Sequence, residues 1–160
     1  MDWTYLQPVE IIFKTGGIDE LDAICASRAY HAGVLVCDPF FVKSGLAQKT
    51  LEAAGGRLKA MFSEVTPNPR TAEANACAEL LRSSGADFAV ALGGGSAIDC
   101  AKIACALATC PEKAEAYHTG GQTLPGTALP LIAIPTTAGT GSEVTGVSVL
   151  TDPDKGVKAP

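Results

Sequence analysis

The sequence contains few of the residues that build metal centres. Only two histidines, His31 and His118, occur among its 160 residues, and neither belongs to an H-x3-H or Asp-x3-His pattern. The six cysteines form no C-x-x-C pair. Because zinc sites are built from closely spaced Cys and His ligands, we expect no metal ligand in this chain.

Long runs of one residue type are also absent. Lysine and arginine occur singly and the net charge is −5, so no basic stripe is available to bind nucleic acid. No apolar run is long enough to cross a bilayer, and Met1 to Tyr5 do not resemble a signal peptide. The cysteines are spread through apolar segments, as core residues are in a reducing compartment. We therefore expect a soluble, cytoplasmic protein without nucleic-acid or membrane partners.

Three common functional motifs are missing as well. The sequence has no G-x-S-x-G nucleophile elbow and no G-x-x-x-x-G-K-[ST] phosphate loop. The usual dinucleotide fingerprint, G-x-G-x-x-G, would require glycine in place of Ile98 and would follow the first strand. These absences argue against a covalent hydrolase, a kinase and a nucleotide hydrolase.

What the sequence does contain is a regular alternation of apolar runs and helical segments. Five runs have the length of buried strands, at 11–13, 34–37, 58–62, 88–92 and 131–134. Helical patterns separate the first four, at about 18–25, 39–54 and 71–82. A last strand is expected at 147–150, before a turn at 152–156. The pattern predicts one α/β domain over residues 1–160, Rossmann-like and doubly wound, with a mostly parallel sheet and helices on both faces.

The clearest candidate site follows the fourth apolar run, where glycines 93–95 lead directly into a helix. Glycines let the backbone approach a phosphate, and the free N–H groups at a helix start favour an anion such as a pyrophosphate. Alternatively, Ser96 caps the helix, Asp99 completes a capping box, and the glycines only form a tight turn. Lys102 lies three residues after Asp99, so the two side chains are expected to pair on one helix face.

Two other strand ends carry polar residues, and in open α/β sheets ligands bind at such ends. Asp38 ends the second run, where a carboxylate can bind a ribose diol and repel a 2′-phosphate, which favours NAD over NADP. The alternative for Asp38 is a simple Asp-Pro helix start. The Thr- and Gly-rich segment 135–145 follows the fifth run and suits phosphate recognition, although a solvent loop has the same composition.

Two segments of the sequence form a pair: Gly93-Gly94-Gly95-Ser96-x-x-Asp99-x-x-Lys102 and, further along, Pro135-Thr136-Thr137-Ala138-Gly139-Thr140-Gly141-Ser142-Glu143. This pair resembles the paired motifs of the iron-containing (group III) alcohol dehydrogenases. The resemblance extends over the whole chain. It implies a dehydroquinate synthase-like N-terminal domain that binds NAD. In that family a helical second half binds iron through one aspartate and three histidines, and those positions are expected beyond Pro160, outside this chain.

The resemblance also implies roles for individual residues. Gly94, Gly95 and Ser96 should contact the pyrophosphate, and Asp38 the adenosine ribose. The other cofactor-cleft positions that it implies are Asn68, Asp99, Thr136, Thr137, Thr140 and Lys158, with Ser142 and Ser148 as further candidates. It identifies no catalytic residue within this chain.

The expected function is therefore the NAD-binding portion of an iron-dependent alcohol dehydrogenase. Such an enzyme transfers hydride between a short-chain alcohol or aldehyde and NAD(H), and the chain alone is not expected to be catalytically competent. The alternatives are a stand-alone nucleotide-binding module without catalysis and a polyol dehydrogenase of the glycerol type. The resemblance also implies a homodimer, since members of that family often dimerise through an early strand, and the apolar residues 11–13 are the candidate segment. The alternative is that this strand pairs within its own sheet.

Overall fold

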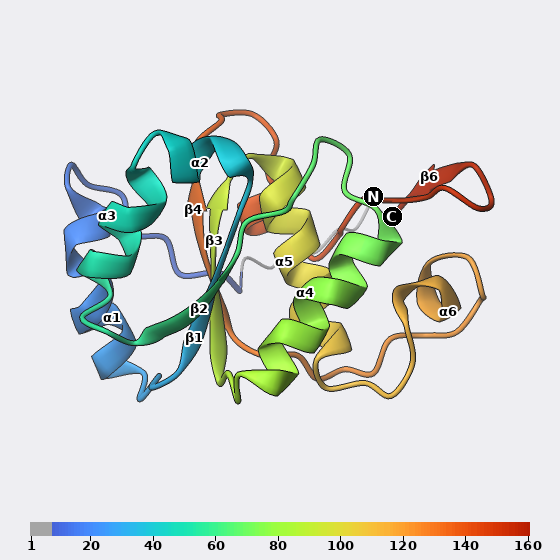
Figure 1. Ribbon diagram of the computed structural model, residues 1–160, viewed down its shortest axis with the longest axis horizontal. Coiled ribbons are helices and arrows are strands. Elements are labelled where there is room, and N and C mark those ends of the chain that lie inside the picture. Colours follow the sequence, from blue (N-terminus) through green and yellow to red (C-terminus); the bar gives the residue numbers. More distant parts are fainter. Residues whose placement is uncertain (1–7) are drawn as a thin grey trace, which may run out of the picture.

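The computed structural model describes residues 8–160, whose centre is a parallel sheet of four strands (Figure 1). Met1 to Tyr5, where we expect no signal peptide, lie outside this range. The strands are β1 (Gly33–Cys37), β2 (Leu58–Phe62), β3 (Phe88–Gly93) and β4 (Leu131–Pro135). Their order in the sheet is β2-β1-β3-β4, and all three neighbouring pairs are parallel. The predicted α/β class and parallel sheet are confirmed.

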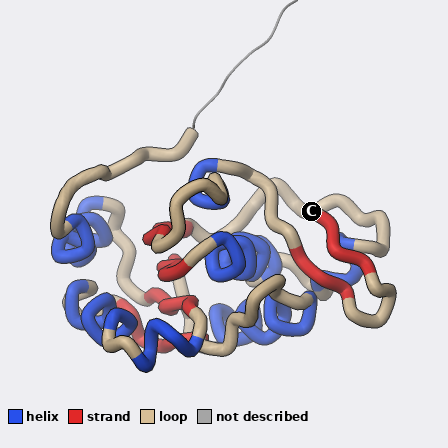
Figure 2. The backbone as a smooth tube through the Cα atoms, turned by 90° about the horizontal axis from the view of Figure 1, so that it is seen from above, coloured by secondary structure: helices blue, strands red, loops and turns tan. Residues whose placement is uncertain are grey.

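Helices cover both faces of the sheet, as Figure 2 shows with the strands seen nearly end-on. The long helices α4 (Thr71–Ser83) and α5 (Gly95–Leu107) pack on one face in the larger apolar cluster. The remaining helices near the sheet cover the other face. They are η1 (Gly17–Glu20), α1 (Leu21–Ser27), α2 (Pro39–Lys43) and α3 (Leu46–Ala53).

The apolar runs predicted the two central strands because both strands are buried along their whole length. Every residue of β1 and β3 is buried, because each strand has a neighbour on both sides and a helix layer on both faces. The edge strands β2 and β4 are only partly buried. All six cysteines are free and buried.

Three predicted elements differ from the structure. No strand forms over residues 11–13, where Ile11 is 64% and Phe13 98% exposed, because this segment has no paired neighbour. The helix predicted over 39–54 is two helices, interrupted at Gly45, which adopts a left-handed φ of 82°. The strand predicted over 147–150 begins only at Leu150.

The last part of the chain forms a separate hairpin of β5 (Leu150–Asp152) and β6 (Val157–Ala159), which projects at the right of Figure 1. The turn predicted over 152–156 connects these strands and is confirmed. Two short helices precede the hairpin, α6 (Ala114–His118) and η2 (Ser142–Val144). From residue 8 to residue 160, no helix combines the length and apolar character needed to cross a membrane.

Candidate dinucleotide-binding site

The strand order places the candidate site at the point where the chain changes direction across the sheet. From β1 the chain leads to β2 on one side, whereas β3 pairs with the other side of β1. The carboxyl ends of β1 and β3 therefore flank a topological switch point, where open α/β sheets bind their ligands. Asp38 follows β1, and the glycine turn follows β3.

The glycine turn presents free backbone donors at the start of α5. Gly94 is the N-cap, and the first backbone bond of the helix runs from Ile98 N to Gly94 O at 3.2 Å. The N–H groups of Gly95, Ser96 and Ala97 precede that bond and have no partner within the helix. With the partial positive charge of the helix start, they form a cradle suited to a pyrophosphate.

The alternative of a capping box at this helix is wrong. Ser96 lies inside α5, and its Oγ accepts the backbone N–H of Asn68 at 3.3 Å instead of capping the helix. The carboxylate of Asp99 is also directed elsewhere: its two oxygens accept from Ser142 Oγ at 2.9 Å and from Val149 N at 3.0 Å. The predicted ion pair of Asp99 with Lys102 is present at 3.2 Å.

The glycines also allow the loop after β4 to approach the turn closely. A Cβ atom on Gly94 would lie 2.5 Å from Thr137 Oγ1, and one on Gly95 would lie 3.4 Å from Thr140 Cβ. At the start of the loop, Thr136 donates its N–H to Gly93 O at 3.0 Å. The structure therefore brings the three predicted threonines to the glycine turn, and a side chain on Gly94 would have to displace Thr137.

The capping interpretation of Asp38 is confirmed, and the second oxygen of its carboxylate remains available to a ligand. Its Oδ1 accepts the backbone N–H of Phe40 at 2.8 Å, which caps α2. Its Oδ2 lies 3.9 Å from the position of a Cβ atom on Gly93, so the carboxylate is beside the glycine turn. A capping carboxylate in this place can still accept a hydrogen bond from a ribose hydroxyl.

Asn68 and Lys158 meet at the same edge although 90 residues separate them. Lys158 Nζ donates to Asn68 Oδ1 at 2.7 Å, and Asn68 has a left-handed φ of 57°. Because Asn68 N also contacts Ser96, this amine lies near the start of α5, where a cation favours a bound anion. Ser148 lies elsewhere, lining a groove of about 490 Å³ beside Lys102 and Tyr117.

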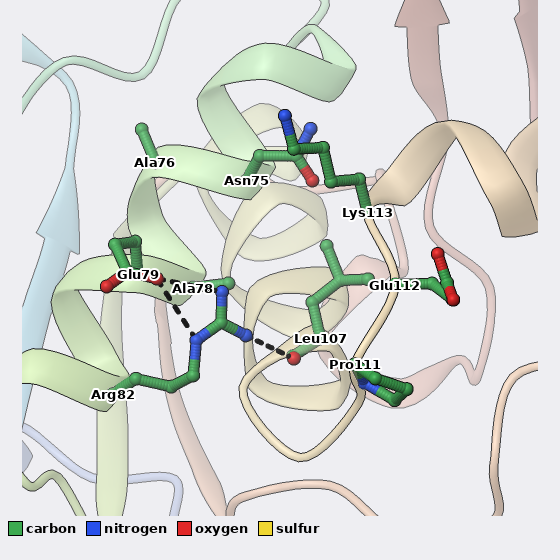
Figure 3. Close-up of a pocket in the computed structure, with 9 residues that line it drawn as sticks. All are labelled: Asn75, Ala76, Ala78, Glu79, Arg82, Leu107, Pro111, Glu112 and Lys113. Atoms are coloured by element: carbon green, nitrogen blue, oxygen red, sulfur yellow. Dashed lines mark hydrogen bonds and ion pairs between the residues drawn. The ribbon is translucent and has the colours of Figure 1, made fainter.

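Another hollow, of about 340 Å³, lies between α4 and the chain that follows α5 (Figure 3). Arg82 lines it and donates to Leu107 O at 2.8 Å and to Glu79 at 3.0 Å. Asn75 accepts Ala114 N at 2.8 Å. Since these polar groups are bonded within the chain and the hollow adjoins the carboxyl end of α5, it is not the candidate site.

Comparison with known proteins identifies the family of this chain. The family model for iron-containing alcohol dehydrogenases matches residues 8–160. The chain belongs to the iron-containing alcohol dehydrogenase family. The family predicted from the paired motifs is thereby confirmed. In residues 8–160, however, no three His, Cys, Asp or Glu side chains lie close enough to hold a metal ion, so these residues do not fit the iron of the family.

Individual members of the family are similar over nearly the whole chain. The sulfoacetaldehyde reductase of Bifidobacterium kashiwanohense, solved in complex with NAD+, is 45% identical with a TM-score of 0.96, covering 100% of this chain and 43% of that one. The 4-hydroxybutyrate dehydrogenase of Cupriavidus necator is 38% identical, covering 88% and 37%. The sulfoacetaldehyde reductase of Bilophila wadsworthia is 36% identical, covering 93% and 39%. The chain thus spans about two fifths of the length of these relatives.

Proposed function

We propose that this chain is the NAD-binding part of an iron-dependent alcohol dehydrogenase that acts on a small alcohol or aldehyde. The observation that carries the proposal is the free N–H cradle at the start of α5, flanked by Asp38 across the switch point between β1 and β3. NAD is the proposed cofactor because a carboxylate beside the ribose disfavours a 2′-phosphate.

Each part of the site has a separate task in this proposal. The N–H groups of Gly95 and Ser96 bind the pyrophosphate, and Asp38 Oδ2 accepts from the adenosine ribose. Lys158 supplies positive charge at the opposite wall, and the loop threonines contact the cofactor through hydroxyls. When bound, the nicotinamide supplies the acceptor for hydride from the alcohol carbon. The residues of this chain bind and orient the cofactor.

The proposal assigns the iron and the substrate walls to a part of the protein outside residues 8–160. No cluster of metal-binding side chains is found within that range. We propose that a further helical domain supplies the iron ligands and that this chain alone does not turn over alcohols. The six free cysteines support a reducing compartment, and we propose the cytoplasm.

The test is a calorimetric titration of NAD+ into the chain and into two variants. Ser96→Glu places a carboxylate at the cradle, whereas Ser83→Glu adds the same charge at an exposed position on α4. We expect a dissociation constant of roughly 0.1 to 1 mM, or about −5 to −4 kcal/mol, for the chain and for Ser83→Glu. Loss of binding in Ser96→Glu alone supports the site, and equal binding by both variants contradicts it.

A second measurement separates the proposed function from a nucleotide-binding module without catalysis. The protein that contains this chain and the proposed metal domain is assayed for reduction of NAD+ with short-chain alcohols, with and without added Fe²⁺. Iron-dependent turnover supports the dehydrogenase. Tight NAD binding without turnover on any alcohol tested would favour the module.

A further inference from the structure

The carboxylate of Asp99 is fully engaged within the chain. It is 8% exposed, and its oxygens accept from Ser142 Oγ at 2.9 Å and from Val149 N at 3.0 Å. Lys102 Nζ lies 3.2 Å from Oδ1. A buried carboxylate is costly unless hydrogen-bonded and paired, and here each requirement is met by α5 itself or by the segment 142–149.

Lys102 binds the same segment from one turn further along α5. Its Nζ donates to the backbone carbonyls of Thr145, at 3.2 Å, and of Val147. The side chain of Lys102 is 17% exposed, so these contacts are partly shielded from water. Asp99 therefore holds N–H and O–H donors of the segment, and Lys102 holds its carbonyl acceptors.

These contacts fix the far end of the loop that faces the glycine turn. Its near end is held where Thr136 donates to Gly93 O at 3.0 Å. Thr137 and Thr140 lie between the two attachments. The loop also contains glycines, whose backbone entropy is large when unrestrained. A loop held at both ends needs less ordering when a ligand binds.

We propose that Asp99 and Lys102 form a latch that holds residues 142–149 on α5 and thereby positions the loop threonines for the cofactor. Both are positioning residues. The proposal rests on the proposed NAD-binding function for its purpose, but the latch itself is a property of the free chain. It also explains why an otherwise apolar helix carries two charges three residues apart.

The experiment measures backbone hydrogen exchange of residues 142–149 and the dissociation constant for NAD+ in the same variants. Ser142→Ala removes one hydroxyl donor and leaves the ion pair intact, so it tests the latch without leaving a buried charge unpaired. Lys102→Met removes the carbonyl contacts, and Lys102→Arg retains the charge and the donors. Lys49→Met is the matched control, because Lys49 forms an exposed ion pair with Asp19 at 3.3 Å.

In Ser142→Ala and Lys102→Met we expect exchange roughly tenfold faster in 142–149 and unchanged in β3, with NAD+ binding weakened by a similar factor. Lys102→Arg and Lys49→Met should resemble the unmodified chain. Unmodified exchange rates in both latch variants would overturn the latch. Faster exchange with unchanged NAD+ affinity would overturn its link to the cofactor. If the unmodified chain binds no NAD+, the proposed function fails, and the exchange rates alone decide the latch.

Discussion

Lys158 Nζ donates to Oδ1 of Asn68 at 2.7 Å, which joins the β5–β6 hairpin to the loop after β2. Asn68 in turn contacts Ser96 at the start of α5. A hairpin that projects from the sheet therefore supplies one wall of the candidate site. Its position depends on the residues that attach it to the rest of the chain, and Asp152 is the most buried polar one, at 1% exposure.

We predict that Asp152 makes the stability of the hairpin depend on pH. Hydrogen bonds from Thr119 Oγ1 at 2.8 Å and from the N–H groups of Lys155 and Asp154 lower the pKa of the Asp152 carboxyl. A folded-state pKa below the unfolded value stabilises the protein above that unfolded value, and the stabilisation is lost as pH falls through the folded pKa.

The test is urea unfolding of the chain and of Asp152→Asn between about pH 5 and pH 2. The variant should be less stable than the unmodified chain at pH 5, and the difference should shrink as the pH falls. Asp154→Asn, at an exposed neighbouring position, is the control and should retain the normal pH profile. A constant difference between Asp152→Asn and the unmodified chain at every pH would contradict the prediction.

Gly94→Ala should weaken NAD+ binding at least roughly tenfold, or about 1.4 kcal/mol. The new Cβ would lie 2.5 Å from Thr137 Oγ1 and would occupy the space next to the cradle. The melting temperature should change little, because Thr137 is exposed and can move. Calorimetry of Gly94→Ala with and without Thr137→Ala distinguishes a blocked cradle from a displaced threonine. Gly126→Ala, in open space, serves as the control and should bind normally.

The central fold could be predicted because local pattern and tertiary environment agree there. Val34 and Val90 belong to continuous apolar runs, and both strands are buried on both faces. The run at 11–13 has the same composition but no neighbouring strand, and hydrogen-bonded pairing is what defines a strand. Gly45 divides the predicted helix, because glycine adopts a left-handed φ at little energetic cost. The spacing of apolar residues alone does not reveal this break.

The site could be predicted only in part, because its contacts join distant segments. The glycine turn and Asp38 follow apolar runs, so they can be recognised from the sequence. The strand order that makes them neighbours is not. Ser96 and Asp99 have the spacing of a capping box, but tertiary contacts to other loops take both side chains. The charges of Asp99 and Lys102 stand out on an otherwise apolar helix. Their spacing predicted the ion pair between them, but it did not predict their contacts with residues 142–149.

Gly33→Ala should lower the free energy of unfolding by about 1 to 3 kcal/mol through overpacking. A Cβ atom at this position would lie 2.4 Å from Phe88 Cζ and 2.9 Å from Leu58 Cδ2. Phe88 is fully buried and stacks on Tyr30 with ring centroids 5.1 Å apart, so it cannot withdraw. Urea unfolding measures the change. Gly17→Ala, whose Cβ would have its nearest neighbour at 3.6 Å, should be close to neutral, and an equal loss there would contradict the packing argument.

The homodimer expected from residues 11–13 remains a prediction, and the exposure of this segment supports it. Ile11 is 64% and Phe13 98% exposed, which is costly for apolar side chains in water. If the segment mediates self-association, Phe13→Ser should shift sedimentation equilibrium toward the monomer. Phe40→Ser, at another exposed aromatic residue, is the comparison and should leave the equilibrium unchanged. A monomeric unmodified chain would remove the segment as an interface.

Asp38→Asn should raise the affinity for NADP+ relative to NAD+ by roughly tenfold. The substitution removes a negative charge whose repulsion of a 2′-phosphate costs about 1 kcal/mol or more. Asparagine is a good N-cap, so α2 should keep its start and the melting temperature should hold. The measurement is paired titration of both cofactors into Asp38→Asn and into Glu64→Gln, which neutralises an exposed carboxylate beyond the end of β2. If the ratio of the NADP+ and NAD+ affinities changes in Asp38→Asn alone, this carboxylate determines the cofactor selectivity. An equal change in both variants would mean that net charge, and not contact with the ribose, sets the preference.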